Sequence, residues 1–311
     1  MEKNIIGGSA LIEGLLMIGP QDAAIAIRKP DGDIFIERRK LSGKSKLAKV
    51  PVIRGIISFL RQMLLSTKAM IFSAEFIEVE DESEEPLTER LLSRLFGGKM
   101  KDFIVYLSLV LSLVFSIGLF VLLPNIMAGF LHFEKSTSRG VISYNFFEGL
   151  IRMSLFLGYL VLTSRFHEMK RVWQYHGAEH KTINCYEDGV DLSIANVMKY
   201  STKNRRCGTS YLFLVLMISI LFFSLLGWYS LWMNMLIRLL SLPAVAGLSY
   251  EAFRYAATSD SKLAQMIAMP GLWFQKLTTA EPDEKQVEVA ISAFNHVMGR
   301  NGNPEMLDSL Q

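Results

Sequence analysis

Two long stretches without charge constrain this chain most. The first runs from Phe103 to Leu123, twenty-one residues with no charged side chain, and the second from Ser210 to Tyr229. At about 1.5 Å per residue, a helix of this length crosses the roughly 30 Å hydrocarbon core of a bilayer. Helices satisfy their own backbone hydrogen bonds in lipid, so these stretches predict membrane-spanning helices.

Two weaker apolar stretches add further candidate spans. Residues 144–164 are apolar apart from Glu148 and Arg152, and residues 230–250 are interrupted only by Arg238. Glu148 and Arg152 are four residues apart and can pair along their own helix, whereas Arg238 has no charged neighbour in its span. Charges at this depth face a bundle interior or a wet cavity, and pairing that holds the bundle is favoured over a substrate path. About four transmembrane helices are therefore predicted.

The distribution of basic residues predicts the orientation. Residues 28–49 and 165–209 each contain eight Lys or Arg, whereas the connection 132–143 contains two. Because cytoplasmic loops are enriched in Lys and Arg, we expect a multi-pass protein of the cell inner (plasma) membrane with both termini in the cytoplasm. Cys185 and Cys207 would then stay reduced, so no disulfide is expected.

The segments outside the spans carry their own signals. Residues 22–39 alternate apolar and polar residues around a Pro-Asp-Gly-Asp turn, which predicts a β-hairpin. Residues 53–76 are amphipathic at helical spacing and are expected to lie in the membrane interface or to pack against the spans. The acidic run at 78–86 is expected to be a solvated linker. Asp283 and Gln286 form a capping box before a soluble helix.

The predicted fold class is mainly α: a polytopic membrane protein with a small N-terminal β element and cytoplasmic amphipathic helices. Its expected parts are a β-rich cytoplasmic segment (1–50), an interfacial helix with an acidic linker (51–102), a four-helix transmembrane region with the cytoplasmic loop 165–209 (103–255), and a cytoplasmic C-terminal segment (256–311).

The stretch YHGAEHKTINCYE carries the clearest chemistry. On a helix each residue advances by about 100°, so His176 and His180 share one face and Glu179 lies about 60° to the other side of His176. This H-x-x-E-H spacing is typical of zinc peptidases of the inverted type. Two imidazoles hold the metal, and a carboxylate that is not a ligand takes a proton from water.

A further ligand must come from elsewhere, with Glu251 and Cys207 as candidates. Glu251 lies near the end of the last predicted span, where it can instead be an interfacial anchor beside Arg254. Cys185 and Cys207 together with the two histidines would give a closed, structural site. That set lacks the spacing of common zinc fingers, so the open site is favoured, with a divalent metal, zinc in preference, as the cofactor.

Five segments of the chain resemble the YqhQ-like family of bacterial membrane proteins: GGSALIEGLLMIGP, HGAEHKTINCYEDG, RCGTSYL, GLSYEAFRY and PGLWFQKLTTAEP. The resemblance implies a membrane protein predicted to be a metal-dependent enzyme. Its pattern covers Glu13, His176, Glu179, His180, Cys185, Glu187, Cys207 and Glu251. The chain departs from it at Asn204 and Arg205, where the family often has a His-Pro pair, and at Ile18, where it often has arginine.

These observations predict a membrane-embedded metal-dependent hydrolase, peptidase-like in its motif, that acts at the cytoplasmic membrane face. His176 and His180 would be ligands, Glu179 the general base, and Glu251 or Cys207 a further ligand. Membrane lipid is the expected partner, with a membrane-protein or lipid-linked substrate and no nucleic acid. The alternative is a scaffold, assembly factor or transporter with a structural metal or a polar hub.

Overall fold

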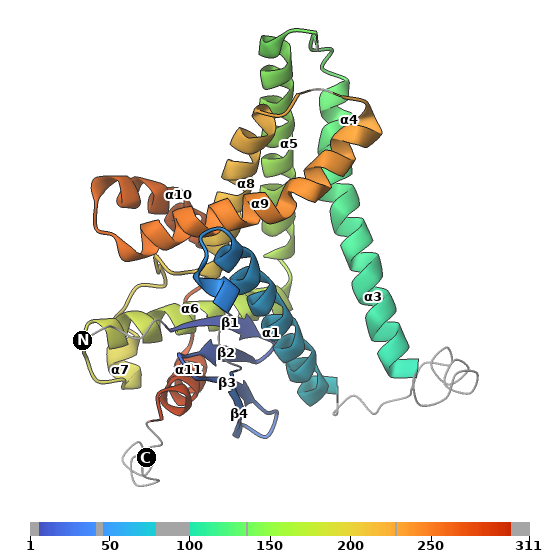
Figure 1. Cartoon of the computed structure of the whole chain (residues 1–311). Coiled ribbons are helices and arrows are strands. Elements are labelled where there is room, and N and C mark those ends of the chain that lie inside the picture. Colours follow the sequence, from blue (N-terminus) through green and yellow to red (C-terminus); the bar gives the residue numbers. More distant parts are fainter. Residues whose placement is uncertain (1–5, 42–45, 79–99, 135, 228, 300–311) are drawn as a thin grey trace. The chain divides into compact units, whose positions relative to one another are not determined.

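The computed structural model describes residues 6–41, 46–78, 100–134, 136–227 and 229–299. The described chain is mainly helical with a four-stranded sheet near its N-terminus, which confirms the predicted fold class (Figure 1). It divides into two compact units. Unit 1 comprises Met1–Ile77, Leu160–Val215 and Pro243–Gln311, and unit 2 comprises Glu78–Tyr159 and Leu216–Leu242.

The sheet of unit 1 is an antiparallel meander in the order β1-β2-β3-β4. The predicted hairpin is confirmed as β3 and β4, and Gly32 in their turn has a φ of +95°, which glycine adopts without strain. A second hairpin precedes it. The strands are β1 (Gly7–Leu11), β2 (Gly14–Ile18), β3 (Asp22–Arg28) and β4 (Ile34–Lys40).

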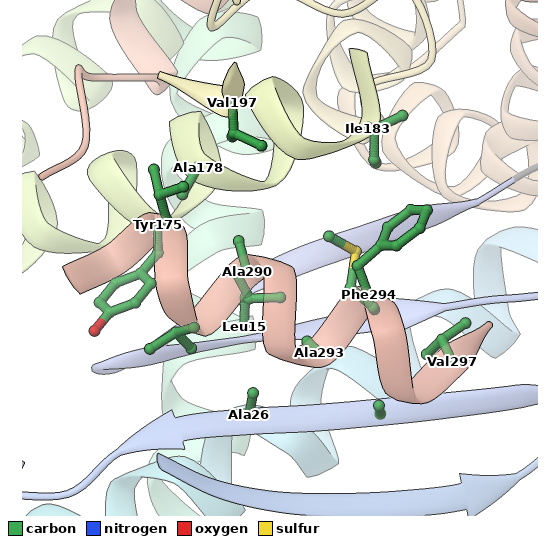
Figure 2. Packing of buried hydrophobic residues seen from close by; sticks show 14 of the residues in the cluster. Leu15, Ala26, Tyr175, Ala178, Ile183, Val197, Ala290, Ala293, Phe294 and Val297 are labelled. Atoms are coloured by element: carbon green, nitrogen blue, oxygen red, sulfur yellow. The ribbon is translucent and has the colours of Figure 1, made fainter. Parts of the chain in front are cut away.

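Both faces of the central strands are buried. Successive side chains of a strand point to opposite faces, so Leu15 and Met17 of β2 lie on one face and Leu16 on the other. The first face packs against α6 (His167–Glu187) and α11 (Glu284–Val297), as Figure 2 shows. The second packs against α1 (Ile53–Glu78). This packing anchors α6, the helix that carries the histidine motif.

The two amphipathic helices predicted from sequence are confirmed as α1 and α11, including the capping box of α11 between Asp283 and Gln286. On α1, Ala69 packs against the sheet, while Leu60 and Leu64 are 51% and 64% exposed. Beyond Glu78, the predicted acidic linker lies outside the described residues.

Among the described residues, three helical stretches are long and apolar enough to span a membrane: Leu107–Gly129, Ser138–Thr163 and Trp232–Thr258. The first comprises most of α3 (Met100–Ile117), a π-helical turn η3 (Gly118–Leu122) and α4 (Leu123–Gly129). The others belong to α5 (Ser138–Thr163) and α9 (Leu231–Thr258).

The predicted span at residues 210–229 forms a helix that is shorter than its apolar run. It forms α8 (Gly208–Ser224), a helix of 17 residues. The N–H groups of Leu225 and Leu226 donate to the Phe222 and Phe223 carbonyls, so the helix closes in a turn before the apolar run ends. Further on, the Asn234 amide bonds both the N–H and the carbonyl of Tyr229. The remaining elements are η1 (Lys46–Lys49), α7 (Ile194–Val197) and α10 (Lys262–Thr278).

Unit 2 contains a cluster of buried charges. Arg152 donates to the Glu148 carboxylate at 2.6 Å, which confirms the pairing predicted along α5. Arg238 of α9, which has no charged neighbour in its own span, donates to Glu148 as well and to Asn145 at 2.8 Å. Arg152 also donates to the Phe120 carbonyl of the π-helical turn at 2.8 Å. These contacts join the helices of unit 2.

Candidate metal centre

The helix α6 is polar in sequence and yet buried along its second half. Each residue from Tyr175 to Ile183 is buried. One side lies on the sheet and α11, and Lys181 donates across another side to the Met198 and Tyr200 carbonyls at 3.0 and 2.7 Å. Buried polar side chains need partners of this kind, since an unpaired buried polar group is costly.

Gly177 allows the chain after α10 to approach α6 closely. The Ala280 N–H donates to the Trp173 carbonyl at 3.0 Å. A Cβ at position 177 would collide with the Ala280 carbonyl, so only glycine fits this approach without a shift. The glycine inside the motif therefore brings the end of α10 to the histidines.

His176, His180 and Cys207 lie together in unit 1. One ligand atom from each lies within 4.8 Å of the other two, and all three residues are buried. The Nε2 of His176 lies 3.2 Å from the Cys207 Sγ, and the two imidazole centroids are 4.4 Å apart. This group can bind a metal ion, since imidazole nitrogen and thiolate sulfur are ligands of transition metals.

Backbone carbonyls fix the orientation of both imidazoles. The Nδ1 of His176 donates to the Thr278 carbonyl at 2.7 Å, and the Nδ1 of His180 donates to the Thr202 carbonyl at 2.5 Å. A carbonyl only accepts, so each Nδ1 carries a hydrogen, and in the neutral form of each ring the Nε2 has the lone pair that a metal needs. The His180 Nε2 has no hydrogen-bond partner among the described residues. Histidines that ligate metals are held by such outer contacts.

The electrostatics of the group favour a thiolate. Burial raises the pKa of Cys207, but the charges of His176 and His180 outweigh it, so the pKa lies well below that of an ordinary thiol. Burial lowers the pKa of His176, but the adjacent Cys207 outweighs burial and raises it to about 9. The Thr209 N–H also donates to the Cys207 Sγ at 3.3 Å. The thiolate is the form that binds metals.

Glu179 is the buried carboxylate of the site. Only 5% of the residue is exposed, and its Oε2 has no hydrogen-bond partner among the described residues. The Gly8 N–H of β1 hydrogen-bonds the carboxylate. Burial raises the pKa of Glu179, against the opposite influence of His176 and His180. The sheet therefore holds one side of this carboxylate, and one oxygen remains available to a ligand.

The other ligand candidates lie elsewhere. Glu251 forms an ion pair with Arg54 and accepts the Val52 N–H at 3.0 Å. The Cys185 Sγ lies 3.8 Å from the Val190 carbonyl. Neither Glu251 nor Cys185 belongs to the group of His176, His180 and Cys207 found in the described part of the chain.

Glu13 and Glu187, which belong to the family pattern, each form an ion pair with an arginine. Glu13, in the turn between β1 and β2 with a φ of +50°, pairs with Arg171 of α6. Glu187 pairs with Arg206, next to Cys207. Neither carboxylate belongs to the group of His176, His180 and Cys207 among the described residues, and both pairs fix segments that carry this group.

Sequence reasoning missed the backbone partners of the site. The Thr202 and Thr278 carbonyls and the Gly8 N–H have no signature of their own, although Gly8 and Thr278 lie in segments that carry the family resemblance. Asn204, at the departure from that pattern, is buried and donates to Asn184 at 2.9 Å. Its backbone N–H donates to Gln275 at 2.9 Å.

These features define a class: a mainly helical protein with helices long enough to span a membrane and a buried His2Cys group. A family model described as "Protein of unknown function (DUF1385)" matches residues 50–300, and the chain belongs to this family. It is 34% identical over 302 residues to the "Uncharacterized protein YqhQ" of Bacillus subtilis (strain 168), covering 94% of this chain and 92% of that protein. No solved structure matches.

Proposed function

We propose that this protein is a membrane-embedded, metal-dependent hydrolase that acts at the cytoplasmic membrane face. One observation carries the proposal. Two buried histidines with carbonyl-bound Nδ1 atoms converge with a cysteine thiolate, beside a buried glutamate that has an unpartnered oxygen. A ligand set with an adjacent free carboxylate is the arrangement that metal-assisted hydrolysis requires.

The donor set fits zinc. His176 and His180 would each offer an Nε2, and Cys207 would offer its Sγ. Zinc takes such nitrogen and sulfur ligands, and three protein ligands leave one position for water or substrate, as in catalytic sites. When bound, the metal would supply Lewis acidity and lower the pKa of a water molecule.

Glu179 would act as the general base. It lies one residue before His180, and Gly8 holds its carboxylate from the sheet side. Its free Oε2 would accept the proton of the attacking water, and the same carboxyl group would return a proton to the leaving group. Burial supports this role, because a raised pKa brings a carboxylate closer to the range of an efficient base at neutral pH.

The substrate is proposed to be a membrane protein or a lipid-linked molecule. α6 follows α5, a candidate span, after only three residues, so the motif starts close to a membrane surface. The eight basic residues between positions 165 and 209 support a cytoplasmic location, because Lys and Arg concentrate on that side.

Elemental analysis of the purified full-length protein tests the proposal. We expect about one zinc per chain in the wild type, no zinc in His176→Ala/His180→Ala, and unchanged zinc in Glu179→Gln. His167→Ala is the matched control, since His167 is an exposed histidine at the start of the same helix. Hydrolysis of membrane-protein or lipid-linked substrates should then be lost in Glu179→Gln. A wild type that stays metal-free after reconstitution would overturn the proposal.

A second candidate is a scaffold, assembly factor or transporter in which the metal is structural. The burial of the group favours it, because His180 is only 1% exposed and Cys207 only 4%. X-ray absorption of the zinc-loaded protein separates the two functions. An oxygen from water as the fourth ligand supports the hydrolase, and a fourth protein ligand supports the structural site.

A further inference from the structure

A second polar site adjoins the metal centre in unit 1. It is a cavity of about 450 Å³, a size typical of small-molecule sites, and it includes none of the three metal-binding residues. Its charged lining residues are Glu187, Lys203, Arg205, Arg206 and Asp260.

The charges of this cavity leave a positive excess. Arg206 pairs with Glu187, and Arg205 pairs with Asp260 at 3.3 Å. Lys203 is exposed and forms no ion pair with any described residue, so three basic side chains face two acidic ones. Lys and Arg side chains converging on one cavity bind phosphate oxygens through charge-assisted hydrogen bonds.

The cavity lies at the end of a candidate span. Ala257 and Thr258, which line it, are the last residues of the stretch Trp232–Thr258. A segment that ends a membrane span lies at the depth of the lipid headgroups. Phosphate groups of phospholipids are concentrated at this depth.

The neighbouring helix α10 presents an apolar face. Three residues separate the end of α9 from the start of α10. Leu263, Met266, Met269 and Trp273 recur at helical spacing and are 57%, 67%, 63% and 59% exposed. The opposite face, with Phe274 and Gln275, is buried. An amphipathic helix beside a span, with exposed large apolar residues and Trp, lies in the membrane interface. Leu272 of α10 also lines the cavity.

The same segments hold the metal centre. Thr202, whose carbonyl orients His180, directly precedes Lys203, and Cys207 directly follows Arg206. Thr278, the last residue of α10, supplies the carbonyl that orients His176. A molecule bound in the cavity would therefore contact the segments on which both imidazoles depend.

We propose that this cavity binds the phosphate of an anionic phospholipid headgroup, with the acyl chains along the exposed face of α10. Lys203 supplies the unpaired charge for the phosphate, and Arg205, whose pair with Asp260 is exposed to solvent, donates beside it. Leu272 marks the passage from headgroup to acyl chain. If the protein is the proposed hydrolase, this site indicates that its substrate is a phosphate-bearing lipid. Only the hydrolysis of that lipid depends on the proposed function, because binding alone requires no metal.

Native mass spectrometry of the full-length protein in detergent tests the site. Phosphatidylglycerol is titrated beside diacylglycerol, which lacks the phosphate, and glycerol phosphate, which lacks the acyl chains. We expect phosphatidylglycerol to bind at least tenfold more tightly than either. Lys203→Gln/Arg205→Gln should weaken its binding about tenfold. The matched control is Lys170→Gln/Lys199→Gln, the same charge change at exposed lysines outside the cavity, which should bind as the wild type.

Three outcomes would overturn the lipid site: equal affinity for diacylglycerol, equal affinity for glycerol phosphate, or unchanged binding in Lys203→Gln/Arg205→Gln. The single variant Lys203→Gln changes only an exposed, unpaired side chain and should weaken binding in the same direction. Zinc is measured on the same preparations. A metal-free protein that binds phosphatidylglycerol would contradict the hydrolase proposal and support the lipid site. A zinc-loaded protein without lipid preference would support the metal centre and contradict the lipid site.

Discussion

Two of the buried polar clusters in the described part of the chain differ in how their atoms are partnered. In unit 2, the Glu148 carboxylate accepts from both Arg152 and Arg238, so each arginine has a charged partner. In unit 1, His176 and His180 are held by carbonyls, but the His180 Nε2 and the Glu179 Oε2 have no partner among the described residues.

This difference separates a cluster that joins helices from one that is suited to a ligand. Buried polar atoms without partners are rare in folded proteins, because each costs about 1–3 kcal/mol. In unit 2 both guanidinium groups pair with the same carboxylate, so each charge of the cluster has a partner. In unit 1 the unpartnered atoms lie beside a thiolate and in a group that can bind a metal, so a ligand there would satisfy them.

The largest expected effect is on metal binding when one cysteine is changed. Cys207→Ser replaces the thiolate with a poor zinc ligand, and we expect zinc affinity to fall by at least a hundredfold, measured by competition with a chelator. Cys185→Ser is the matched control, since Cys185 is also buried but lies outside the group. Equal zinc loss in both variants would contradict the His2Cys site.

A large effect on stability is expected in unit 2. Glu148→Gln leaves Arg152 and Arg238 buried without their carboxylate, and breaking a buried pair costs about 3–5 kcal/mol. Thermal unfolding in detergent should show this loss, while zinc per folded chain stays at the wild-type value. A stable Glu148→Gln variant would mean that the cluster does not hold unit 2 together.

A smaller effect is expected where the sheet meets Glu179. In Gly8→Ala the new Cβ would collide with the Leu16 carbonyl oxygen of β2 and lie 2.9 Å from the Glu179 carboxyl carbon, and overpacking of this kind costs about 1–3 kcal/mol. Gly7→Ala is the control, because its Cβ would meet nothing within 4 Å. Equal unfolding temperatures for the two variants would show that position 8 is not closely packed against the Leu16 carbonyl and the Glu179 carboxylate.

The smallest effect is expected at the half-exposed pair of Glu13 and Arg171. Their side chains are 25% and 36% exposed, so solvent weakens the pair and Glu13→Gln should cost about 1 kcal/mol or less. We expect zinc content to be unchanged. Loss of zinc in Glu13→Gln would show that this contact, which fixes α6 to the β1–β2 turn, is needed to form the metal site.

Local periodicity made part of the structure predictable. The hairpin of β3 and β4, the helices α1 and α11 and the spacing of His176, Glu179 and His180 follow from residues close together in the chain. The length of α8 did not, because the helix closes in a turn at Leu225 and Leu226 although the apolar run continues.

The sequence by itself determined that two imidazoles and a carboxylate lie near one another on α6, since a helix repeats every 3.6 residues. Only the tertiary structure decided which distant side chain joins them. Cys207 lies beside His176, while Glu251 pairs with Arg54. It also decided that Arg238 pairs with Glu148. These are contacts between residues far apart in the chain, and they depend on how whole helices pack, which no local spacing encodes.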